Sequence, residues 1–273
     1  PLIDASGSQT IQQLLALGEE RLSDATTLAT WQQALAETNR ILSDLPERSD
    51  YNEILQQAFG NAGTDPDSFA TNETSVATSL NGSGLQITAE LRSNDELNGA
   101  AAAYAPVGHT GEERIYVNAD WIASGASVET IRQVLLEESG HAIDRRLNGS
   151  FDAKGDEGQL FATLLTGNAL SDAERAAIQA DDDSSVLTIN GQQINVELAT
   201  DAIASFNISS DSGSSASDLV TNQSSQNLSG TLTVSKSDAG SVWISQNGSA
   251  RIQASVTKSG STYSWTLNGI TLS

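Results

Sequence analysis

Apolar residues recur at helical spacing near the start of the chain and predict a helical hairpin over residues 1–63. The first helix is expected to begin near Ser8 or Thr10, and a second helix is expected over residues 23–45. A shorter third helix covers residues 51–59. The first two helices are predicted from the spacing of the apolar residues Ile11, Leu14, Leu15, Leu22, Leu28, Trp31, Leu35, Ile41 and Leu42.

Residues 64–199 mix helical and strand patterns and predict an α+β domain. Residues 64–84 are rich in Asp, Ser, Thr, Asn and Gly, which predicts a loop with one turn of helix. Alternation of apolar and polar residues predicts a strand over residues 85–91. The small apolar residues 100–104 indicate either another strand or tight packing.

The clearest hairpin of the chain is expected over residues 186–198. Two alternating runs flank Asn190-Gly191, and this dipeptide between such runs is the strongest short hairpin signal. A short helix is expected before it, over residues 171–180. The acidic run 181–183 lacks the spacing of a calcium-binding loop and is expected to be a solvated turn.

The stretch from Val134 to Ala162 holds two helical patterns separated by a glycine-containing turn, and one of the two histidines of the chain lies in it. Ser127 is a good N-cap for the first of these helices. Asn148-Gly149 is a good stop signal at the other end. A short connection lets the second helix fold back against the first, so the stretch predicts a packed helix pair.

Glu137 and His141 lie four residues apart, so a helix that turns about 100° per residue places them on one side, one turn apart. Asp144 follows on the same side. A carboxylate and an imidazole in this arrangement form a platform for a metal ion, since zinc binds both. Asp156 and Glu157 open the next helix and offer a third ligand. The competing interpretation is that these acids are solvated helix charges around a core histidine.

The sequence VLLEESGHAID resembles the active-site helix of zincin metallopeptidases, whose motif is HExxH. GDEGQLFA likewise resembles the downstream glutamate helix of the gluzincin group. The resemblance implies that Glu137, His141 and Glu157 hold a divalent cation, zinc in the first place. It also implies that Glu138 acts as the general base.

Two further features extend the resemblance. RIYVNADWI, residues 114–122, is similar to the edge strand that borders a zincin cleft. Residues 85–198 as a whole are similar to a domain of large secreted bacterial surface proteins with an EExGHxxD…GDEGxxF signature. Within such a site Asp144 and Asp156 would orient the ligands, with Asp144 holding His141.

One position departs from the zincin motif, because Glu137 stands where the first histidine ligand would be. A set of two glutamates and one histidine is harder and more anionic than two histidines and one glutamate. Such a set is less selective for zinc and accepts calcium or manganese. The site would then belong to a divergent peptidase, a degenerate one, or a purely structural metal centre.

From about residue 200 the composition shifts to Ser, Thr, Asn, Gly and β-branched residues, which predicts a β-sandwich over residues 200–273. The run GSARIQASVTKSGSTYSWTLNGI resembles bacterial Ig-like modules of surface adhesins. Only about five strands are expected, whereas Ig-like modules usually have seven. The module is therefore expected to borrow a strand, either from the N-terminal PLID segment of a neighbouring copy or from a further strand of the parent chain. The strand candidates are 203–208, 228–234, 242–245, 250–256 and 263–267.

The formal net charge of −22 is distributed unevenly, because only four acidic and three basic residues follow Thr200. Such an acidic chain repels nucleic acid and anionic lipid, and it contains no apolar run long enough to insert into a membrane. The composition resembles that of proteins secreted by type I systems, which implies an extracellular or cell-surface location. The second histidine, His109, is expected to be solvated in the turn 108–111.

The sequence therefore predicts a secreted surface-protein module with a metal-binding helix pair, related to metallopeptidases and acting on a peptide substrate. The alternative is a structural subunit of an extracellular adhesin or filament, with strand exchange between copies. In either case the expected partners are other copies of the chain or neighbouring surface modules.

Overall fold

The chain forms two compact units, residues 1–200 and 201–273, which are described separately. Helices and separate sheets build the two units, so the α+β class expected from the sequence is confirmed at that level. The computed structural model describes residues 12–167, 170–199, 202–212, 220–233, 242–244, 252–259 and 262–271.

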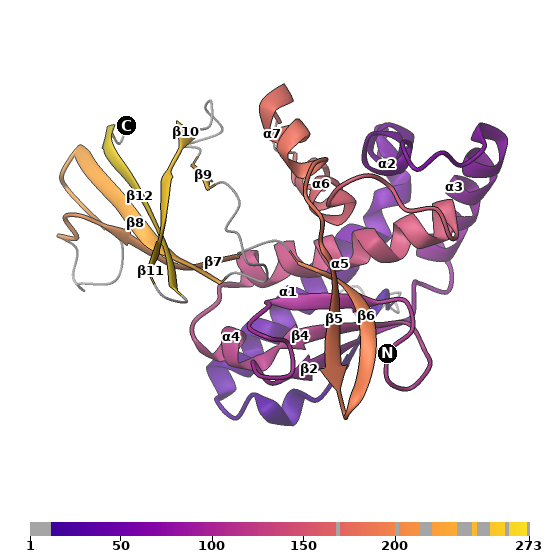
Figure 1. Ribbon diagram of the computed structural model, residues 1–273, viewed down its shortest axis with the longest axis horizontal. Helices are drawn as coiled ribbons and strands as arrows, with labels where there is room; N and C mark the ends of the chain where they lie inside the picture. Colours follow the sequence, from indigo (N-terminus) through magenta and orange to yellow (C-terminus); the bar gives the residue numbers. More distant parts are fainter. Residues whose placement is uncertain are drawn as a thin grey trace. The chain divides into compact units, whose positions relative to one another are not determined.

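The first unit places helices against a six-stranded sheet of order β1-β2-β4-β3-β6-β5 (Figure 1). Strands β1, β2 and β4 run parallel, and the remaining pairs are antiparallel. The strands are β1 (Leu14–Leu17), β2 (Ile87–Arg92), β3 (Ala102–Ala105), β4 (Arg114–Asn118), β5 (Ser184–Ile189) and β6 (Gln192–Leu198). The helices are α1 (Ala25–Asp44), α2 (Tyr51–Phe59), α3 (Pro66–Asn81), α4 (Ala119–Ala123), α5 (Val128–Asn148), α6 (Glu157–Leu165) and α7 (Asp172–Ile178), with 3-10 turns η1 (Glu19–Arg21) and η2 (Leu45–Glu47).

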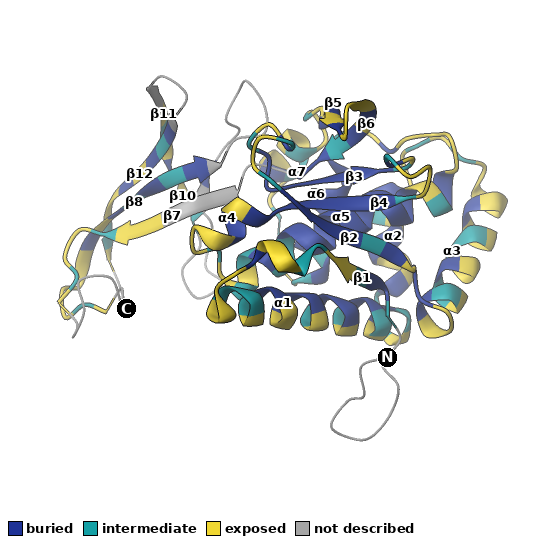
Figure 2. Ribbon diagram, turned by 90° about the horizontal axis from the view of Figure 1, so that it is seen from below, coloured by how far each residue is buried: buried dark blue, intermediate teal, exposed yellow. Residues whose placement is uncertain are grey.

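Helix α5 is the central helix of this unit. It packs against β3 and β6 of the sheet and against α1, α2, α3 and α6 on its other sides. Figure 2 shows α5 behind the row of strands, which are mostly buried, and α1 below them, on the side of β1. Ser127 caps the helix by accepting a hydrogen bond from the Thr130 N–H, and Gly149 ends it with a positive φ of 68°. Both ends agree with the sequence signals.

The first predicted helix is wrong, because Leu14–Leu17 is strand β1, paired in parallel with β2. A short apolar run such as LLAL fits a strand as well as a helix, so periodicity could not decide between them. A side chain from α1 stabilises the strand: the Asn39 Oδ1 accepts hydrogen bonds from the N–H groups of Gln13 and Leu14, at 2.6 and 2.8 Å. The first 63 residues are therefore not a separate helical hairpin.

The segment expected to be a loop at residues 64–84 is also corrected, because it contains the 16-residue helix α3. Asp65 caps this helix through the Ser68 N–H, and Pro66 occupies its first turn. Both are helix-start signals, but the polar composition of the segment obscured them. Only a narrow apolar stripe faces inward, formed by Phe69, Val76 and Leu80.

Strand β4 is not the edge strand that the zincin resemblance implied. It lies between β2 and β3, and all five of its residues are buried (Figure 2). The edges of the sheet are β1 and β5 instead. Any groove bordered by an edge strand of this sheet must therefore lie along the β5–β6 hairpin or along β1.

The predicted Asn190-Gly191 hairpin is confirmed as β5 and β6, with positive φ at both turn residues. Two register pairs, Ala103↔Leu198 and Tyr104↔Glu197, join β6 to β3, and the Ala199 N–H directly after β6 donates to the Ala102 carbonyl oxygen at 3.2 Å. One hairpin face packs into an apolar core of Leu97, Ala100, Ala103, Ala105, Tyr116, Leu187, Ile189, Ile194, Val196 and Leu198.

The second unit contains a four-stranded sheet of order β11-β12-β8-β7 and a two-stranded sheet, β10-β9. Trp265 is fully buried in its core, while Ile252 is half exposed. The N-terminal PLID segment lies outside the described residues. The strands are β7 (Ala202–Ile208), β8 (Ser225–Thr233), β9 (Trp243–Ile244), β10 (Ile252–Gln253), β11 (Ser255–Ser259) and β12 (Thr262–Thr271). Among the described residues, no helix has the length and apolar character that crossing a membrane requires.

Replacing Asn39 by Ala should lower the free energy of unfolding by about 1–3 kcal/mol, because buried N–H groups of β1 lose their acceptor. Chemical denaturation followed by circular dichroism would measure the loss. Gln33→Ala, at an exposed position of the same helix, is the matched control and should change stability by less than about 0.5 kcal/mol. Equal effects of the two substitutions would contradict this role of Asn39.

Candidate metal centre

Two glycines let α5 and α6 approach closely. A Cβ atom on Gly140 would lie 2.8 Å from the Cα atom of Gly158. A Cβ atom on Gly158 would lie 2.5 Å from His141 Nε2 and 2.6 Å from the carbonyl oxygen of Glu137. Real Cβ atoms do not come this close to their neighbours, so only glycine at both positions permits the crossing. The first turn of α6 therefore lies directly against His141.

One nitrogen of the His141 ring faces two carboxylates. His141 Nδ1 lies 2.8 Å from Glu157 Oε1 of α6 and 3.1 Å from Glu197 Oε2 of β6. Glu197 pairs in register with Tyr104 of β3, and the Tyr104 ring stacks on the imidazole with centroids 6.2 Å apart. The register pair Tyr104 and Glu197 thus fixes the ring from the side of the sheet.

The other ring nitrogen faces Asp183, which immediately precedes β5. His141 Nε2 and Asp183 Oδ2 are 3.4 Å apart and fully buried. Neither atom has a hydrogen-bond partner among the described residues. A buried polar atom without a hydrogen bond costs free energy, and here two such atoms face one another at ion-pair distance, with Gly158 packed directly against the imidazole.

The geometry fits a divalent cation. Two ligands each about 2.1 Å from a tetrahedral ion are about 3.4 Å apart, close to the distance between His141 Nε2 and Asp183 Oδ2. One atom each from His141, Glu157 and Asp183 lie within 4.8 Å of one another. An imidazole nitrogen and carboxylate oxygens are both ligands of zinc and of harder divalent ions.

The predicted general base, Glu138, is fully buried, and neither of its carboxylate oxygens has a hydrogen-bond partner among the described residues. Burial raises the pKa of Glu138 well above its usual range, and His141 opposes that rise. Nearby Glu137, Asp156 and Asp183 raise the pKa further. A carboxylate so placed is a strong base once ionised, because few groups stabilise its charge.

The other predicted residues lie around this cluster in different roles. Glu137 is buried on α5 but belongs to neither group of potential ligands found among the described residues. Asp156 caps α6 by accepting a hydrogen bond from the Gln159 N–H at 2.8 Å. Asp144 accepts a hydrogen bond from Asn148 Nδ2 at 2.7 Å. Asp144 was expected to hold His141, but Glu157 and Glu197 are the carboxylates beside His141 Nδ1.

A second acidic group shares one member with the first. Asp144, Asp152 and Glu157 also bring one carboxylate oxygen each to within 4.8 Å of one another. Burial, followed by the charge of Glu157, raises the pKa of Asp144 to about 8. This group contains no nitrogen ligand, and Asp152 is exposed to solvent.

The sequence patterns did not identify Asp183 and Glu197 as members of the site. Asp183 was expected to be solvated, but it is 5% exposed because it begins the hairpin that packs over α5. The strand alternation of β6 carried a signal, since Ile194, Val196 and Leu198 face the apolar core and Glu197 must face the opposite side. Which element covers that opposite side could not be read from the pattern.

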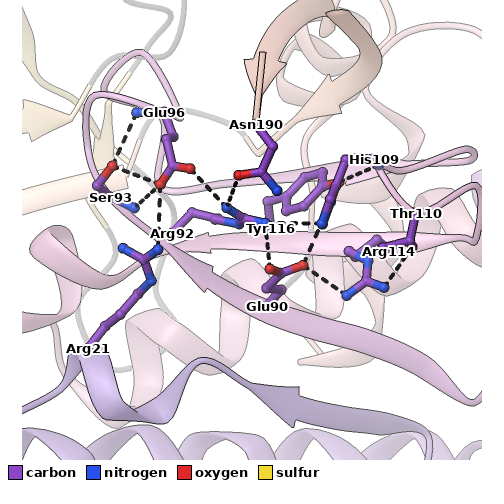
Figure 3. A network of polar contacts seen from close by, with 10 residues as sticks. All are labelled: Arg21, Glu90, Arg92, Ser93, Glu96, His109, Thr110, Arg114, Tyr116 and Asn190. Carbon is purple, nitrogen blue, oxygen red and sulfur yellow. Dashed lines mark hydrogen bonds and ion pairs between the residues drawn. The ribbon is translucent and has the colours of Figure 1, made fainter. Parts of the chain in front are cut away.

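The other histidine, His109, belongs to a separate network on β2 and β4 (Figure 3). Its side chain is 14% exposed and not solvated, contrary to expectation. Nδ1 lies 2.9 Å from Tyr116 Oη, and Arg92 Nη2 lies 3.2 Å from Nε2. Arg92 donates and cannot accept, so Nε2 must be the acceptor and Nδ1 the protonated nitrogen. Burial, with the charges of Arg92 and Arg114 nearby, lowers the pKa of His109 against the opposing effect of Glu90.

Glu90 is the centre of that network. It lies 2.6 Å from Arg92 Nη2 and 2.8 Å from Arg114 Nη1, and Arg92 Nη1 also donates to Asn190 at the hairpin turn (Figure 3). The ion pairs tie β2, β4 and the hairpin turn together. They supply His109 with partners of its own.

Comparisons of the chain with protein-family models, with curated proteins and with solved structures gave no match.

In the presence of a chelator, stability should fall as the pH rises from about 5 to about 8. Burial raises the pKa of Asp183 to about 8 and that of Glu197 to about 7, and it also raises the pKa of Glu138. Burial alone would lower the pKa of His141, but Glu157, Glu197 and Asp183 raise it well above its usual range. All these groups bind more protons in the folded chain than in the unfolded chain, whose carboxyl pKa is about 4, so deprotonation favours unfolding.

Urea denaturation at pH 5, 6.5 and 8, with EDTA or with a divalent cation, would measure this dependence. A bound cation replaces the protons, so it should reduce the loss of stability toward pH 8. Rising stability over the same pH window in EDTA would contradict the prediction.

Proposed function

We propose that the first unit binds a divalent cation where α5, α6 and the β5–β6 hairpin meet. The observation that carries the proposal is that two buried atoms without a hydrogen bond, His141 Nε2 and Asp183 Oδ2, face each other 3.4 Å apart. Glu157 and Glu197 contact the other ring nitrogen, Nδ1, and would hold the imidazole in orientation.

The charges of the cluster support a cation. One imidazole is surrounded by the carboxylates of Glu157, Asp183 and Glu197, with Glu138 also buried nearby. Buried carboxylates without a counter-charge are costly, so they must be protonated or paired with positive charge. The set, with one nitrogen and several oxygens, favours zinc or manganese and also admits calcium.

The burial of the site favours a cation that holds structural elements together. Asp183 and Glu197 stand at the open end of the hairpin, where the Leu198 N–H donates to the Asp183 carbonyl oxygen at 3.0 Å. Through these residues a cation would connect the hairpin to α5 and α6. This cross-link would add to the two residue pairs that join the hairpin to β3.

We further propose that the unit is zincin-like and a divergent metallopeptidase. The resemblance of EESGH and GDEG to the zincin helices supports this assignment, and so does the buried carboxylate of Glu138. A bound cation would polarise a peptide carbonyl and acidify a water molecule. Glu138 would accept the proton of that water, and His141 would be held in orientation by Glu157 and Glu197.

The alternative proposal is a structural subunit of an extracellular adhesin or filament, with an Ig-like second unit. Within the described residues β7 and β11 end its larger sheet, and Phe206 and Ile252 are exposed. Such strand edges and apolar side chains suit pairing with a neighbouring copy. A secreted location is proposed for both functions on the acidic composition of the chain.

The cation site predicts a difference between the two histidines. Wild type should bind one equivalent of Zn²⁺ or Mn²⁺ in isothermal titration calorimetry. His141→Ala and Asp183→Asn should each weaken binding by about tenfold or more, because each removes a ligand. His109→Ala is the matched control and should bind as wild type does, since its partners are Arg92 and Tyr116. Absence of binding by wild type, or equal loss in all three variants, would refute the site.

Hydrolysis is tested separately with Glu138→Gln. The amide is nearly the same size but cannot accept a proton from water, so casein cleavage should fall by about 10²-fold or more while cation binding remains. Mass spectrometry of casein digests would measure the cleavage. If cation-loaded wild type cleaves neither casein nor itself, the structural alternative is favoured.

A further inference from the structure

We infer that the cation reaches its buried ligands through the pocket beside the β5–β6 hairpin, with Glu197 as the residue that passes it inward. The inference rests on the cation site proposed above. It assigns a function to a surface pocket that the site itself does not need for coordination.

The pocket adjoins the cluster through one side chain. Its volume is about 340 Å³. The register pairs Ser184↔Glu197 and Val186↔Asn195 place these four side chains on one face of the hairpin, and Glu197 on that face contacts His141. Its lining consists of Pro106, Ser184, Ser185, Val186, Asn195, Val196 and Glu197.

Exposure singles out Glu197 among the residues that touch His141. Its side chain is 26% exposed, against 2% for Glu157 and 7% for Asp183. One carboxylate therefore contacts both solvent and the buried imidazole. A cation bound first at Glu197 would lie beside the imidazole of the buried site.

The polar part of the pocket lining can hold a hydrated cation. Two serines, an asparagine and a glutamate line the pocket together with a proline and two valines, and no basic side chain is among the lining residues. Hydroxyl, amide and carboxylate oxygens can replace water molecules that an ion sheds on entry. The strongly acidic first 200 residues also raise the local concentration of cations.

Asp152 marks a rival route. It is exposed, and it approaches the cluster through Glu157 and Asp144. Glu197 is favoured because it contacts His141 directly, at 3.1 Å. The two routes differ in which surface substitution should slow the ion.

The test is the rate of Zn²⁺ uptake and release by the full chain. Val186→Trp places a large side chain in the pocket at a position that is half exposed in wild type. The substitution should slow Zn²⁺ uptake about tenfold, and it should slow Zn²⁺ extraction by excess chelator about as much, because it raises the barrier to passage in both directions. The dissociation constant should stay within about twofold, because the ligands are unchanged. Stopped-flow measurements with a zinc indicator would follow both rates.

Matched variants show whether an effect comes from filling the pocket or from placing a Trp side chain anywhere on this face of the hairpin. Asn195→Trp, at the register partner of Val186, should act like Val186→Trp. It keeps the test valid if Val186→Trp does not fold. Thr188→Trp and Gln193→Trp occupy the next register pair on the same face, outside the pocket lining, and should exchange Zn²⁺ at the wild-type rate.

The outcomes are distinct. Unchanged rates in both pocket variants, with normal Zn²⁺ affinity, would overturn the entry route and leave the cation site standing. Slower exchange in Asp152→Asn but not in the pocket variants would assign entry to the Asp152 side instead. Absence of Zn²⁺ binding by wild type would refute the site and the route together.

Discussion

The candidate site depends on the close crossing of α5 and α6 at Gly140 and Gly158. Neither glycine leaves room for a methyl group, because neighbouring atoms would lie 2.5–2.8 Å from a Cβ atom built there. Because the helices meet without side chains at this point, the first turn of α6 lies over His141. Glu157 in that turn then reaches the imidazole at 2.8 Å. The glycines of EESGH and GDEG therefore have a packing reason that is independent of any catalytic function.

The crossing also concentrates charge where water is excluded. A helix N-terminus favours acidic residues through its dipole, and Asp156 and Glu157 occupy the start of α6. The hairpin then adds Asp183 and Glu197 from the other side of His141. An apolar set of residues would pack this position at a lower electrostatic cost, because buried ion pairs often stabilise less than apolar replacements. Retaining so many acids around one histidine is easier to explain by a ligand than by packing.

Local sequence signals predicted the helix and the hairpin that carry the site, but they did not predict all the residues that form it. Ser127, Gly149 and the Asn190-Gly191 turn fixed helix α5 and the hairpin, since caps and turns depend on neighbouring residues alone. The positions of Glu137 and His141 on one side of a helix also followed from spacing. Asp183 and Glu197 could not be identified, because they reach His141 through a tertiary contact between elements some forty residues or more apart.

The two wrongly predicted elements have different causes. Strand β1 depends on tertiary contacts, namely pairing with β2 and the Asn39 side chain, whereas the local start signals of α3 at Asp65 and Pro66 were obscured by its polar composition and narrow apolar stripe.

The hairpin links the stability of the fold to the state of the site. Besides two register pairs with β3, the Ala199–Ala102 hydrogen bond and the Arg92 contact to its turn, its position depends on the apolar core on one face and on the charged cluster on the other. The apolar face holds the hairpin against the sheet regardless of pH or ions. The charged face holds it only when protons or a cation offset the repulsion among the carboxylates of Glu157, Asp183 and Glu197. Ligand binding at such a face contributes directly to the free energy of folding, because the separated elements of the unfolded chain offer no comparable site. The hairpin should consequently be the element whose order changes most when the positive charge at the cluster is removed.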